Sequence, residues 1–269
     1  MIRLLRARLL QGHRTIPFPD GPPPELPARF RGRPEIDAGL CRSGCSACAE
    51  ACPTQAITGG ESVQIDLGRC LFCTDCVEAC PEGAISFTND YRLAVRRRED
   101  LVVRGNQDAL PLAAELGAEL HRLLGRSLKL RQVSAGGCNG CELDTNVLNT
   151  VGWDLGRFGV QFVASPRHAD GLLITGAVSQ NMKLALQKTY DAIPAPKIVI
   201  AVGACAIGGG PFVGHPEVND GATDLLPIDL LIPGCPPHPL TILDGILRLL
   251  GRVDGGKPRP SPADEQPGQ

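Results

Sequence analysis

Twelve cysteines, eight of them in two short runs, are the residues of this 269-residue sequence with the clearest chemistry. The first run is CRSGCSACAEACP, from Cys41 to Pro53, and the second is CLFCTDCVEACP, from Cys70 to Pro81. The runs end in similar phrases, ACPTQAIT at 51–58 and ACPEGAIS at 79–86. The sequence therefore contains an internal duplication of a unit of about 28 residues.

The run C-x₂-C-x₂-C-x₃-C-P is typical of bacterial ferredoxins with two [4Fe–4S] clusters, in which the fourth cysteine binds the other cluster. Three thiolates on one tight loop reach three corners of a cubane, so the fourth comes from the other repeat. The expected ligands are Cys41, Cys45, Cys48 and Cys80 for cluster 1, and Cys70, Cys73, Cys76 and Cys52 for cluster 2. Zinc is the alternative, because two C-x₂-C pairs also bind zinc.

Cys41 departs from this spacing, because CRSGC is C-x₃-C, one residue longer than the rule. Gly44 would let the extra residue bulge outward, since glycine adopts backbone conformations that other residues avoid. We expect Cys41 to bind iron. The alternative is a labile or three-iron cluster in that repeat.

Four further cysteines lie in three later segments: Cys138 and Cys141 in GGCNGCE, Cys205 in GACAIGGG, and Cys235 in PGCPPHP. Each segment follows a predicted strand, and ligands of open α/β sheets bind outside the carboxyl ends of the strands. We expect these four to hold a third [4Fe–4S] cluster, with glycines letting backbone N–H groups approach the sulfurs. For the isolated Cys205 and Cys235, the alternative is a small buried apolar residue.

Two domains are predicted to position these cysteines. Residues 35–90 are interpreted as an α+β ferredoxin-like two-cluster domain. Residues 128–252 are interpreted as an α/β domain, because buried apolar strands alternating with helices predict a mostly parallel sheet. The predicted strands are 128–133, 159–164, 171–176, 197–203 and 229–234, and the predicted helices are 181–193 and 239–251.

The other segments are termini and a connector. Residues 1–34 combine a basic amphipathic pattern over 1–11 with a proline-rich, extended stretch. That pattern suits a helix on a membrane surface, on a partner, or frayed against the body. Residues 91–127 are predicted to be a connector with a helical period over 109–125, and 253–269 a disordered tail.

Composition narrows the function classes. With 27 basic and 29 acidic residues, the formal charge of −2 argues against nucleic acid as the main partner. No apolar run reaches the roughly 18 to 20 residues that cross a bilayer, and no secretory signal stands out, which predicts a cytoplasmic protein. At 43% hydrophobic residues the chain can build a core, so clustered cysteines favour metal or cluster ligation over disulfides.

At these motifs the sequence resembles two known families. RFRGRPE (29–35), the cysteine runs, IDLGRCLFC (65–73) and YRLAVRRREDL (91–101) resemble the two-cluster ferredoxin subunit of formate hydrogenlyase, a relative of a respiratory complex I subunit. GGCNGCE, FGVQFVASPRHADGLLITGAV (158–178), GAC and LIPGCPP (231–237) resemble the small subunit of membrane-bound [NiFe] hydrogenases. The sequence therefore resembles a fusion of two subunits that are usually separate.

The resemblance implies a flavodoxin-like second domain, whose cluster lies proximal to the nickel–iron site of a separate hydrogenase large subunit. The chain would be the electron-transfer subunit of a membrane-associated complex, peripheral on the cytoplasmic side of the cell membrane. Its further partners would be membrane subunits and an electron donor or acceptor, such as a formate dehydrogenase or ferredoxin. Nickel ligands are not expected in this chain.

Two other functions stay open. One is a subunit of a complex I-like energy-converting oxidoreductase without hydrogenase activity, and the other is a free-standing ferredoxin-like carrier. The complex I relatives have two adjacent cysteines at the first position, whereas Cys138 and Cys141 are spaced as in the hydrogenases, which favours the hydrogenase branch.

No catalytic residues are assigned, because no nucleophile–base constellation is visible, as expected of an electron carrier. Glu142, beside a predicted ligand, is a candidate for proton transfer or for an interface carboxylate. Arg167 and His168, in the SPRHAD match, are candidates for contact with the proximal cluster or the large subunit.

Overall fold

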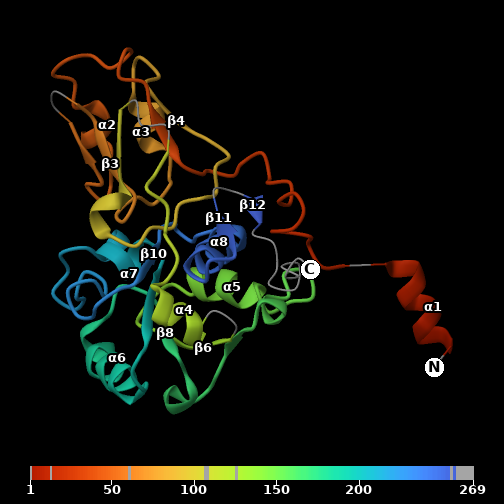
Figure 1. Ribbon diagram of the computed structural model, residues 1–269. Coiled ribbons are helices and arrows are strands. Elements are labelled where there is room, and N and C mark those ends of the chain that lie inside the picture. Colours follow the sequence, from red (N-terminus) through yellow and green to blue (C-terminus); the bar gives the residue numbers. More distant parts are fainter. Residues whose placement is uncertain are drawn as a thin grey trace.

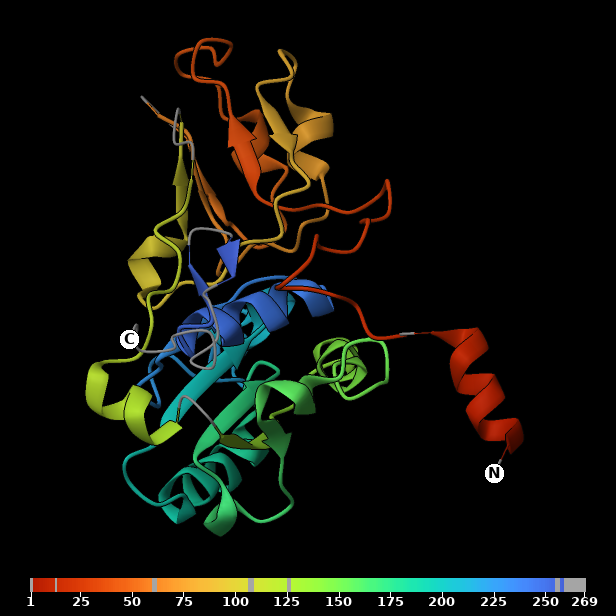
Figure 2. The same ribbon diagram turned by 45° about the vertical axis from the view of Figure 1, so that its right-hand side comes forward.

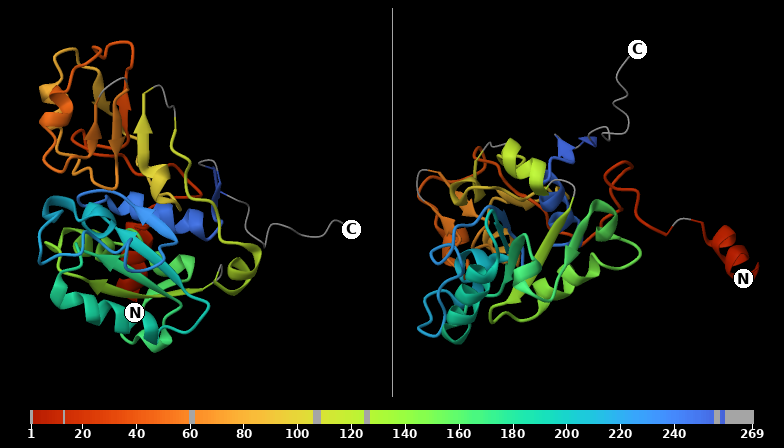
Figure 3. Two further views of the ribbon diagram at one scale, coloured as in Figure 1. Left: turned by 90° about the vertical axis from the view of Figure 1, so that its left-hand side faces the viewer. Right: turned by 60° about the horizontal axis from the view of Figure 1, so that its bottom comes forward.

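The computed structural model describes residues 2–12, 14–59, 62–105, 109–124, 127–254 and 257–258. A ferredoxin-like domain is stacked on a larger sheet domain, and helix α8 (Pro239–Leu249) lies between the small domain and the sheet (Figure 1). The left view of Figure 3 shows the same stacking from the side, with the orange small domain above the green-to-blue sheet domain. The structure thus has a small domain and a sheet domain that lie in contact.

The ferredoxin-like domain consists of short strands and two short helices that carry cysteines. Its elements are β1 (Pro34–Ile36), α2 (Ala47–Glu50), β2 (Ile57–Thr58), β3 (Gln64–Asp66), α3 (Asp75–Ala79) and β4 (Ile85–Phe87). β1 pairs antiparallel with β4, and β2 pairs antiparallel with β3. Cys48 on α2 and Cys76 on α3 are both buried, so each repeat points one helical cysteine into the domain.

The segment 91–127, expected to be a connector, belongs to both domains. η1 (Arg98–Leu101) leads into β5 (Val102–Arg104), which pairs antiparallel with β3 and so extends the small domain. Val95 forms an antiparallel bridge to Leu231 on the edge of the large sheet. The connector therefore ties the two domains together.

The helix predicted over 109–125 is shorter in the structure, where α4 spans Ala118–Leu124 and Gly125 lies outside the described residues. Residues 110–117 are not helical. Pro111 removes an amide donor and disfavours helix at the residue before it, and Gly117 weakens helix entry. The apolar spacing there instead buries Leu110 and Leu116 from a segment without regular secondary structure.

The larger domain is a five-stranded sheet with the order β10-β9-β8-β6-β7, and all its strand pairs are parallel. Its elements are β6 (Leu128–Ser134), α5 (Gly140–Val147), η2 (Leu155–Phe158), β7 (Val160–Phe162), η3 (Pro166–His168), β8 (Gly171–Thr175), α6 (Gln180–Ala192), β9 (Ile198–Val202), α7 (Ala204–Gly208), η4 (Gly210–Phe212), β10 (Leu230–Ile232) and α8. Counted from β6, this is the 2-1-3-4-5 order of flavodoxin. The predicted strands and the two predicted helices of this domain are confirmed.

Helices cover both faces of this sheet. On β8, Leu173 packs into the cluster that contains α8, while Leu172 and Ile174 pack into the cluster that contains Leu186 of α6. Every residue of β8 and β9 is buried, which explains why these strands appear in the sequence as continuous apolar runs.

The two domains share a hydrophobic cluster. Ile65 and Leu67 of the small domain pack in one buried group with Ile207 of α7 and Leu231 of β10. Every residue of α8 is buried, because its outer side meets the connector: a Cβ on Gly245 would lie 2.7 Å from the Ala94 Cβ. This continuous packing fixes how the cysteines of one domain face those of the other.

The N-terminal helix α1 (Ile2–Gln11) stands apart from the body, at the right of Figure 2, and none of its residues is buried. The chain after it is anchored where the Ile16 N–H donates to the Gly152 carbonyl at 2.7 Å and Phe18 is buried. Within the described ranges, no helix combines the length and apolarity that crossing a bilayer requires. At the other end, β11 (Val253–Asp254) pairs antiparallel with β12 (Lys257–Pro258), and the rest of the predicted tail lies outside the described residues.

Candidate cluster-binding sites

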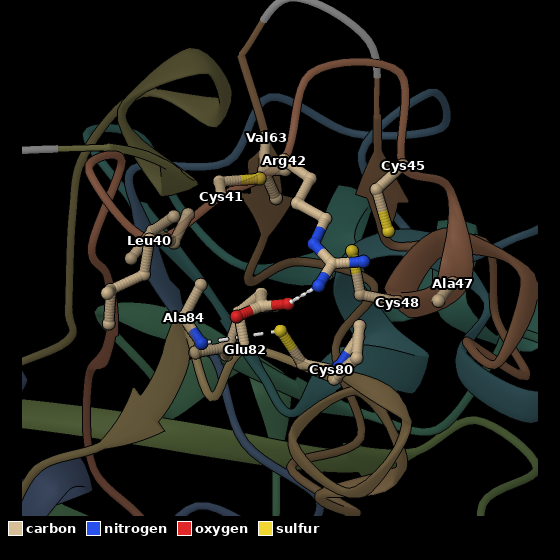
Figure 4. Close-up of a pocket in the computed structure, with 13 residues that line it drawn as sticks. Leu40, Cys41, Arg42, Cys45, Ala47, Cys48, Val63, Cys80, Glu82 and Ala84 are labelled. Atoms are coloured by element: carbon tan, nitrogen blue, oxygen red, sulfur yellow. Dashed lines mark hydrogen bonds and ion pairs between the residues drawn. The ribbon is translucent and has the colours of Figure 1, made fainter.

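The four cysteines predicted for cluster 1 line one apolar cavity, and their sulfurs gather around it in Figure 4. Cys41 is among them, despite its longer spacing. Gly44 adopts a left-handed φ of +77°, and a Cβ there would have no neighbour within 4 Å. The extra residue is thus absorbed in a turn that bulges into open space, as the sequence predicted.

The four cysteines predicted for cluster 2 line a second cavity: Cys52, Cys70, Cys73 and Cys76. Cys52 comes from the first repeat and the other three from the second. Cys80 makes the reverse exchange, since it comes from the second repeat and lines the first cavity. The crossed arrangement expected of a two-cluster ferredoxin is therefore present in the placement of the side chains.

Backbone amides donate to the sulfurs in a way that repeats between the two halves. The Ala56 N–H donates to Cys52 Sγ at 3.2 Å, and the Ala84 N–H donates to Cys80 Sγ at 3.3 Å, each four residues after its cysteine. The Phe72 N–H donates to Cys70 Sγ at 3.3 Å. Hydrogen bonds of this kind stabilise thiolates and help to set the reduction potential of a bound cluster.

The last four cysteines meet at the carboxyl edge of the large sheet. Cys138 follows β6, Cys141 lies in the first turn of α5, Cys205 lies on α7 directly after β9, and Cys235 follows β10. Gly203 has a left-handed φ of +91°, and a Cβ there would lie 2.4 Å from Cys141 Sγ. Glycine is therefore required for the backbone to pass this close to the sulfur.

Burial raises the pKa of several cysteine thiols in the second and third sets. It raises the pKa of Cys70 to about 12 and those of Cys76 and Cys205 to about 11. Burial also raises the pKa of Cys141, and repulsion by the Cys205 thiolate adds to the effect. Thiolates gathered this closely repel one another unless a cationic centre lies between them, so these sets fit a bound metal cluster.

A single metal ion fits the sets less well. Zinc–sulfur bonds of about 2.3 Å would bring four thiolates within about 4 Å of one another. In the part of the chain that the structure describes, no three His, Cys, Asp or Glu side chains lie close enough to hold one ion. Among the described residues, the cysteine sets therefore lack the close grouping of a one-ion site.

The three sets are arranged in series. The Cys48 thiolate of the first set is close enough to contribute, after burial and nearer thiolates, to the raised pKa of Cys76 in the second. Cys73 of the second set likewise contributes to the raised pKa of Cys235 in the third, after burial and Cys138. The second set is thus the neighbour of both others.

A cavity of about 290 Å³ lies between the domains where the second and third sets meet. Cys73 and Cys235 line it together with Arg29, Arg31 and His238. Arg31 donates to the Phe72 carbonyl at 2.8 Å, in the loop between Cys70 and Cys73. The RFRGRPE segment therefore belongs to the interdomain site, a placement that the sequence did not reveal.

His238 also has a structural position that its sequence context did not define. Its Nδ1 accepts from the Leu240 N–H at 3.1 Å and so caps α8. Its ring lies edge-on to Phe30 at 5.5 Å and to Trp153 at 6.0 Å between centroids. Burial lowers its pKa, so the ring is neutral at pH 7.

Glu142 is a buried carboxylate, with only 6% of its surface exposed. The Ser134 hydroxyl donates to its Oε1 at 2.5 Å, and the Thr175 hydroxyl donates to the same oxygen at 2.6 Å. These contacts hold it at the sheet edge beside Cys141 and the rest of the third set. A role in proton transfer stays a prediction.

Arg167 and His168 are exposed on η3 and lie away from the cysteines. The neighbouring Asp170 accepts from the Lys129 N–H at 2.7 Å, at the start of β6. This is the amino edge of the strands, whereas the proximal set lies at the carboxyl edge. The structure therefore does not bring these two residues to the proximal cysteines, and contact with a partner stays a prediction.

Comparison with known proteins agrees with this division of the chain. Residues 138–249 match the family described as NADH ubiquinone oxidoreductase, 20 kDa subunit, and residues 40–84 match the 4Fe-4S dicluster domain. The probable membrane-bound hydrogenase subunit mbhJ of Pyrococcus furiosus is 42% identical over 136 residues, which are 51% of this chain and 81% of that protein.

Two further relatives are named as subunits of other oxidoreductase complexes. Formate hydrogenlyase subunit 7 of Escherichia coli is 39% identical over 158 residues, 58% of this chain and 62% of that protein. An NADH-quinone oxidoreductase subunit of Clostridium beijerinckii is 41% identical over 114 residues, 42% of this chain and 68% of that protein. The chain thus spans less than two thirds of the Escherichia coli relative.

Fold and cysteine sites define an iron–sulfur subunit of an oxidoreductase complex. The chain belongs to the family of the 20 kDa subunit shared by membrane-bound hydrogenases and complex I, and it carries a 4Fe-4S dicluster domain in the same polypeptide.

Proposed function

We propose that this chain is the electron-transfer subunit of a membrane-associated [NiFe] hydrogenase complex, joining an electron donor or acceptor to the nickel–iron site of a separate large subunit. Three [4Fe–4S] clusters, when bound, would supply one-electron redox chemistry at three successive positions. The chain's part is to hold, insulate and space them. The same path serves proton reduction and hydrogen oxidation.

The observation that carries the proposal is the serial arrangement of the twelve cysteines. The second set neighbours the first through Cys76 and Cys48, which pack in one buried cluster, and the third through Cys73 and Cys235, which line one cavity. A storage protein or a structural metal domain has no need of such a chain of sites. A path through one polypeptide suits a fused relay.

The exposed side of the third set supports a covering partner. Cys138 and Cys235 are exposed, and Leu143, two residues after Cys141 on α5, is a large apolar side chain that is 59% exposed. Exposed cluster ligands beside an exposed apolar side chain favour a docked subunit over a free-standing carrier. We infer that the hydrogenase large subunit covers this side.

Helix α1 supports a peripheral place at the membrane. Its sequence has three arginines, no acidic residue and five exposed large apolar side chains: Ile2, Leu4, Leu5, Leu9 and Leu10. Basic and apolar residues on a helix that leaves the body suit attachment to anionic lipid or to membrane subunits. This would put the chain on the cytoplasmic side.

A related complex without hydrogenase activity is the second candidate, because several relatives are named as subunits of NADH-quinone oxidoreductase. The C-x₂-C spacing of Cys138 and Cys141 favours the hydrogenase branch. Both candidates require this chain to carry electrons through its clusters, and they differ in the subunit that receives or supplies those electrons.

The test is anaerobic purification of the native complex through a tag on this chain, with nickel analysis and hydrogen-dependent reduction of a viologen dye. The proposal predicts about one nickel per chain and hydrogen-dependent reduction. In the Cys141→Ser variant, reduction of the physiological acceptor should fall while nickel in the large subunit is retained. An intact iron–sulfur chain that co-purifies without nickel or hydrogen activity would transfer the function to the second candidate.

A further inference from the structure

The two cavities of the ferredoxin-like domain differ in the charges at their mouths. Arg42 and Glu82 form an ion pair, and both line the cavity of Cys41, Cys45, Cys48 and Cys80 (Figure 4). The Arg42 side chain is 69% exposed and the Glu82 side chain 34%. The pair therefore lies at the solvent side of this cavity.

Arg42 belongs to the loop that the extra residue lengthens. Between Cys41 and Cys45 stand Arg42, Ser43 and the left-handed Gly44, which turns the chain outward. The corresponding loop of the second repeat has only Leu71 and the buried Phe72 between its cysteines. The departure from the usual spacing thus coincides with a cation at the mouth of the first cavity.

The partner of Arg42 differs between the repeats in the same way. Glu82 follows Cys80-Pro81, and Thr54 follows Cys52-Pro53 at the matching place. Thr54 is 2% exposed and its hydroxyl donates to the Arg69 carbonyl at 2.8 Å. The second cavity is therefore closed by a neutral buried side chain where the first has a charged, solvent-facing one.

Folding stability gives little reason for this pair, because ion pairs between exposed side chains contribute little. Two opposite charges beside a redox centre do have a direct electrostatic effect. A cation favours the more negative, reduced state of a cluster and raises its reduction potential, while an anion lowers it.

We propose that the Arg42–Glu82 pair is a charge-compensated cap at cluster 1, in which each charge shifts the reduction potential and the two shifts largely offset each other. Arg42 and Glu82 are tuning residues and do not bind iron. This rests on the proposed function, since it requires cluster 1 on the surrounding cysteines. Arg42 raises the potential, Glu82 lowers it, and pairing leaves a small net effect at the site where a carrier would exchange electrons.

The test is potentiometric titration, followed by electron paramagnetic resonance, of the full cluster-bearing chain. The cluster 1 signal is identified first as the one that Cys45→Ser removes. The predicted result is a more negative potential for this signal in Arg42→Gln and a more positive one in Glu82→Gln. The double variant should differ from the parent by less than either single variant, and Arg42→Lys should keep the parent potential.

Arg97→Gln provides the matched control, because Arg97 forms an exposed ion pair with Glu99. The proposal is overturned if Arg42→Gln and Glu82→Gln shift the reduction potential of cluster 1 no more than Arg97→Gln does. It is also overturned if Arg42→Lys shifts this potential as much as Arg42→Gln. If no signal depends on Cys45, the assignment of cluster 1 itself fails. That outcome is visible in the parent and Cys45→Ser spectra before any potential is measured.

Discussion

Cys73 of the ferredoxin-like domain and Cys235 of the sheet domain line the same interdomain cavity. They belong to different sets of four, so their shared cavity is where the second and third sets meet. The shared hydrophobic cluster and the buried connector hold the two domains in this arrangement. The path from one domain to the other thus depends on packing as well as on cysteine spacing.

The crossed placement of Cys52 and Cys80 predicts which cluster each variant loses. Cys80→Ser should remove the cluster held by Cys41, Cys45 and Cys48, although Cys80 lies in the second run. Cys52→Ser should remove the other. Each variant should lose up to about four irons per chain and a different paramagnetic signal. Loss of the same signal in Cys80→Ser and Cys73→Ser would contradict the crossed arrangement.

Gly203 predicts a selective effect on the proximal site. In Gly203→Ala the new methyl group would lie 2.4 Å from Cys141 Sγ, so the sulfur must move. We expect loss of the proximal cluster signal while the two ferredoxin signals remain. Gly214→Ala is the control, since Gly214 also has a positive φ, of +76°, but its Cβ would meet nothing within 4 Å. Equal retention of the proximal signal in both variants would contradict the packing argument.

The buried pair of Asp244 and Arg248 predicts a large stability effect. Arg248 Nε donates to Asp244 Oδ2 at 2.7 Å. The Arg248 side chain is 4% exposed and the Asp244 side chain 1%. Arg248→Met leaves the carboxylate buried without this partner, which costs about 3–5 kcal/mol of unfolding free energy. Urea titration of the cluster-bearing chain measures it. Arg97→Met is the control: because Arg97 belongs to an exposed ion pair, its loss should leave the free energy of unfolding almost unchanged. An equally small effect of Arg248→Met would contradict the prediction.

His238 predicts a loss of stability in mild acid. Burial lowers its pKa below the ordinary 6.5, so the unfolded chain takes up the proton first as pH falls. Folding stability should therefore decrease as pH falls through about 6.5, by a few tenths of a kcal/mol because the ring is only half-buried. His238→Asn keeps a helix-capping acceptor without the titration. Urea midpoints at pH 7.5 and 6.0 should differ less in this variant; an equal difference would exclude His238 as the cause.

The sequence allowed much of this fold to be predicted where local pattern and burial agree. The strands β8 and β9 are buried on both faces, so their apolar runs mark them directly. The cysteine runs predicted two sets of four because cubane ligation imposes fixed spacing. Gly44 was predicted to absorb the extra residue, and its backbone conformation agrees.

Other features depend on tertiary contacts that spacing does not encode. The apolar period over 109–125 predicted one helix, but residues 110–117, which include Pro111 and Gly117, form no regular secondary structure. Residues 91–127 supply β5 to the small sheet because β3 has a free edge there. Cys73 and Cys235 could not be paired from sequence, since their shared cavity forms only where the two domains meet.

The most direct test of the central claim is the iron, zinc and acid-labile sulfide content of the full chain, purified anaerobically. Three [4Fe–4S] clusters predict about twelve irons and twelve sulfides per chain, with no zinc above background. About eleven irons would indicate a three-iron cluster and show that Cys41 does not bind iron. About eight irons, or zinc in place of iron, would contradict the three-cluster relay.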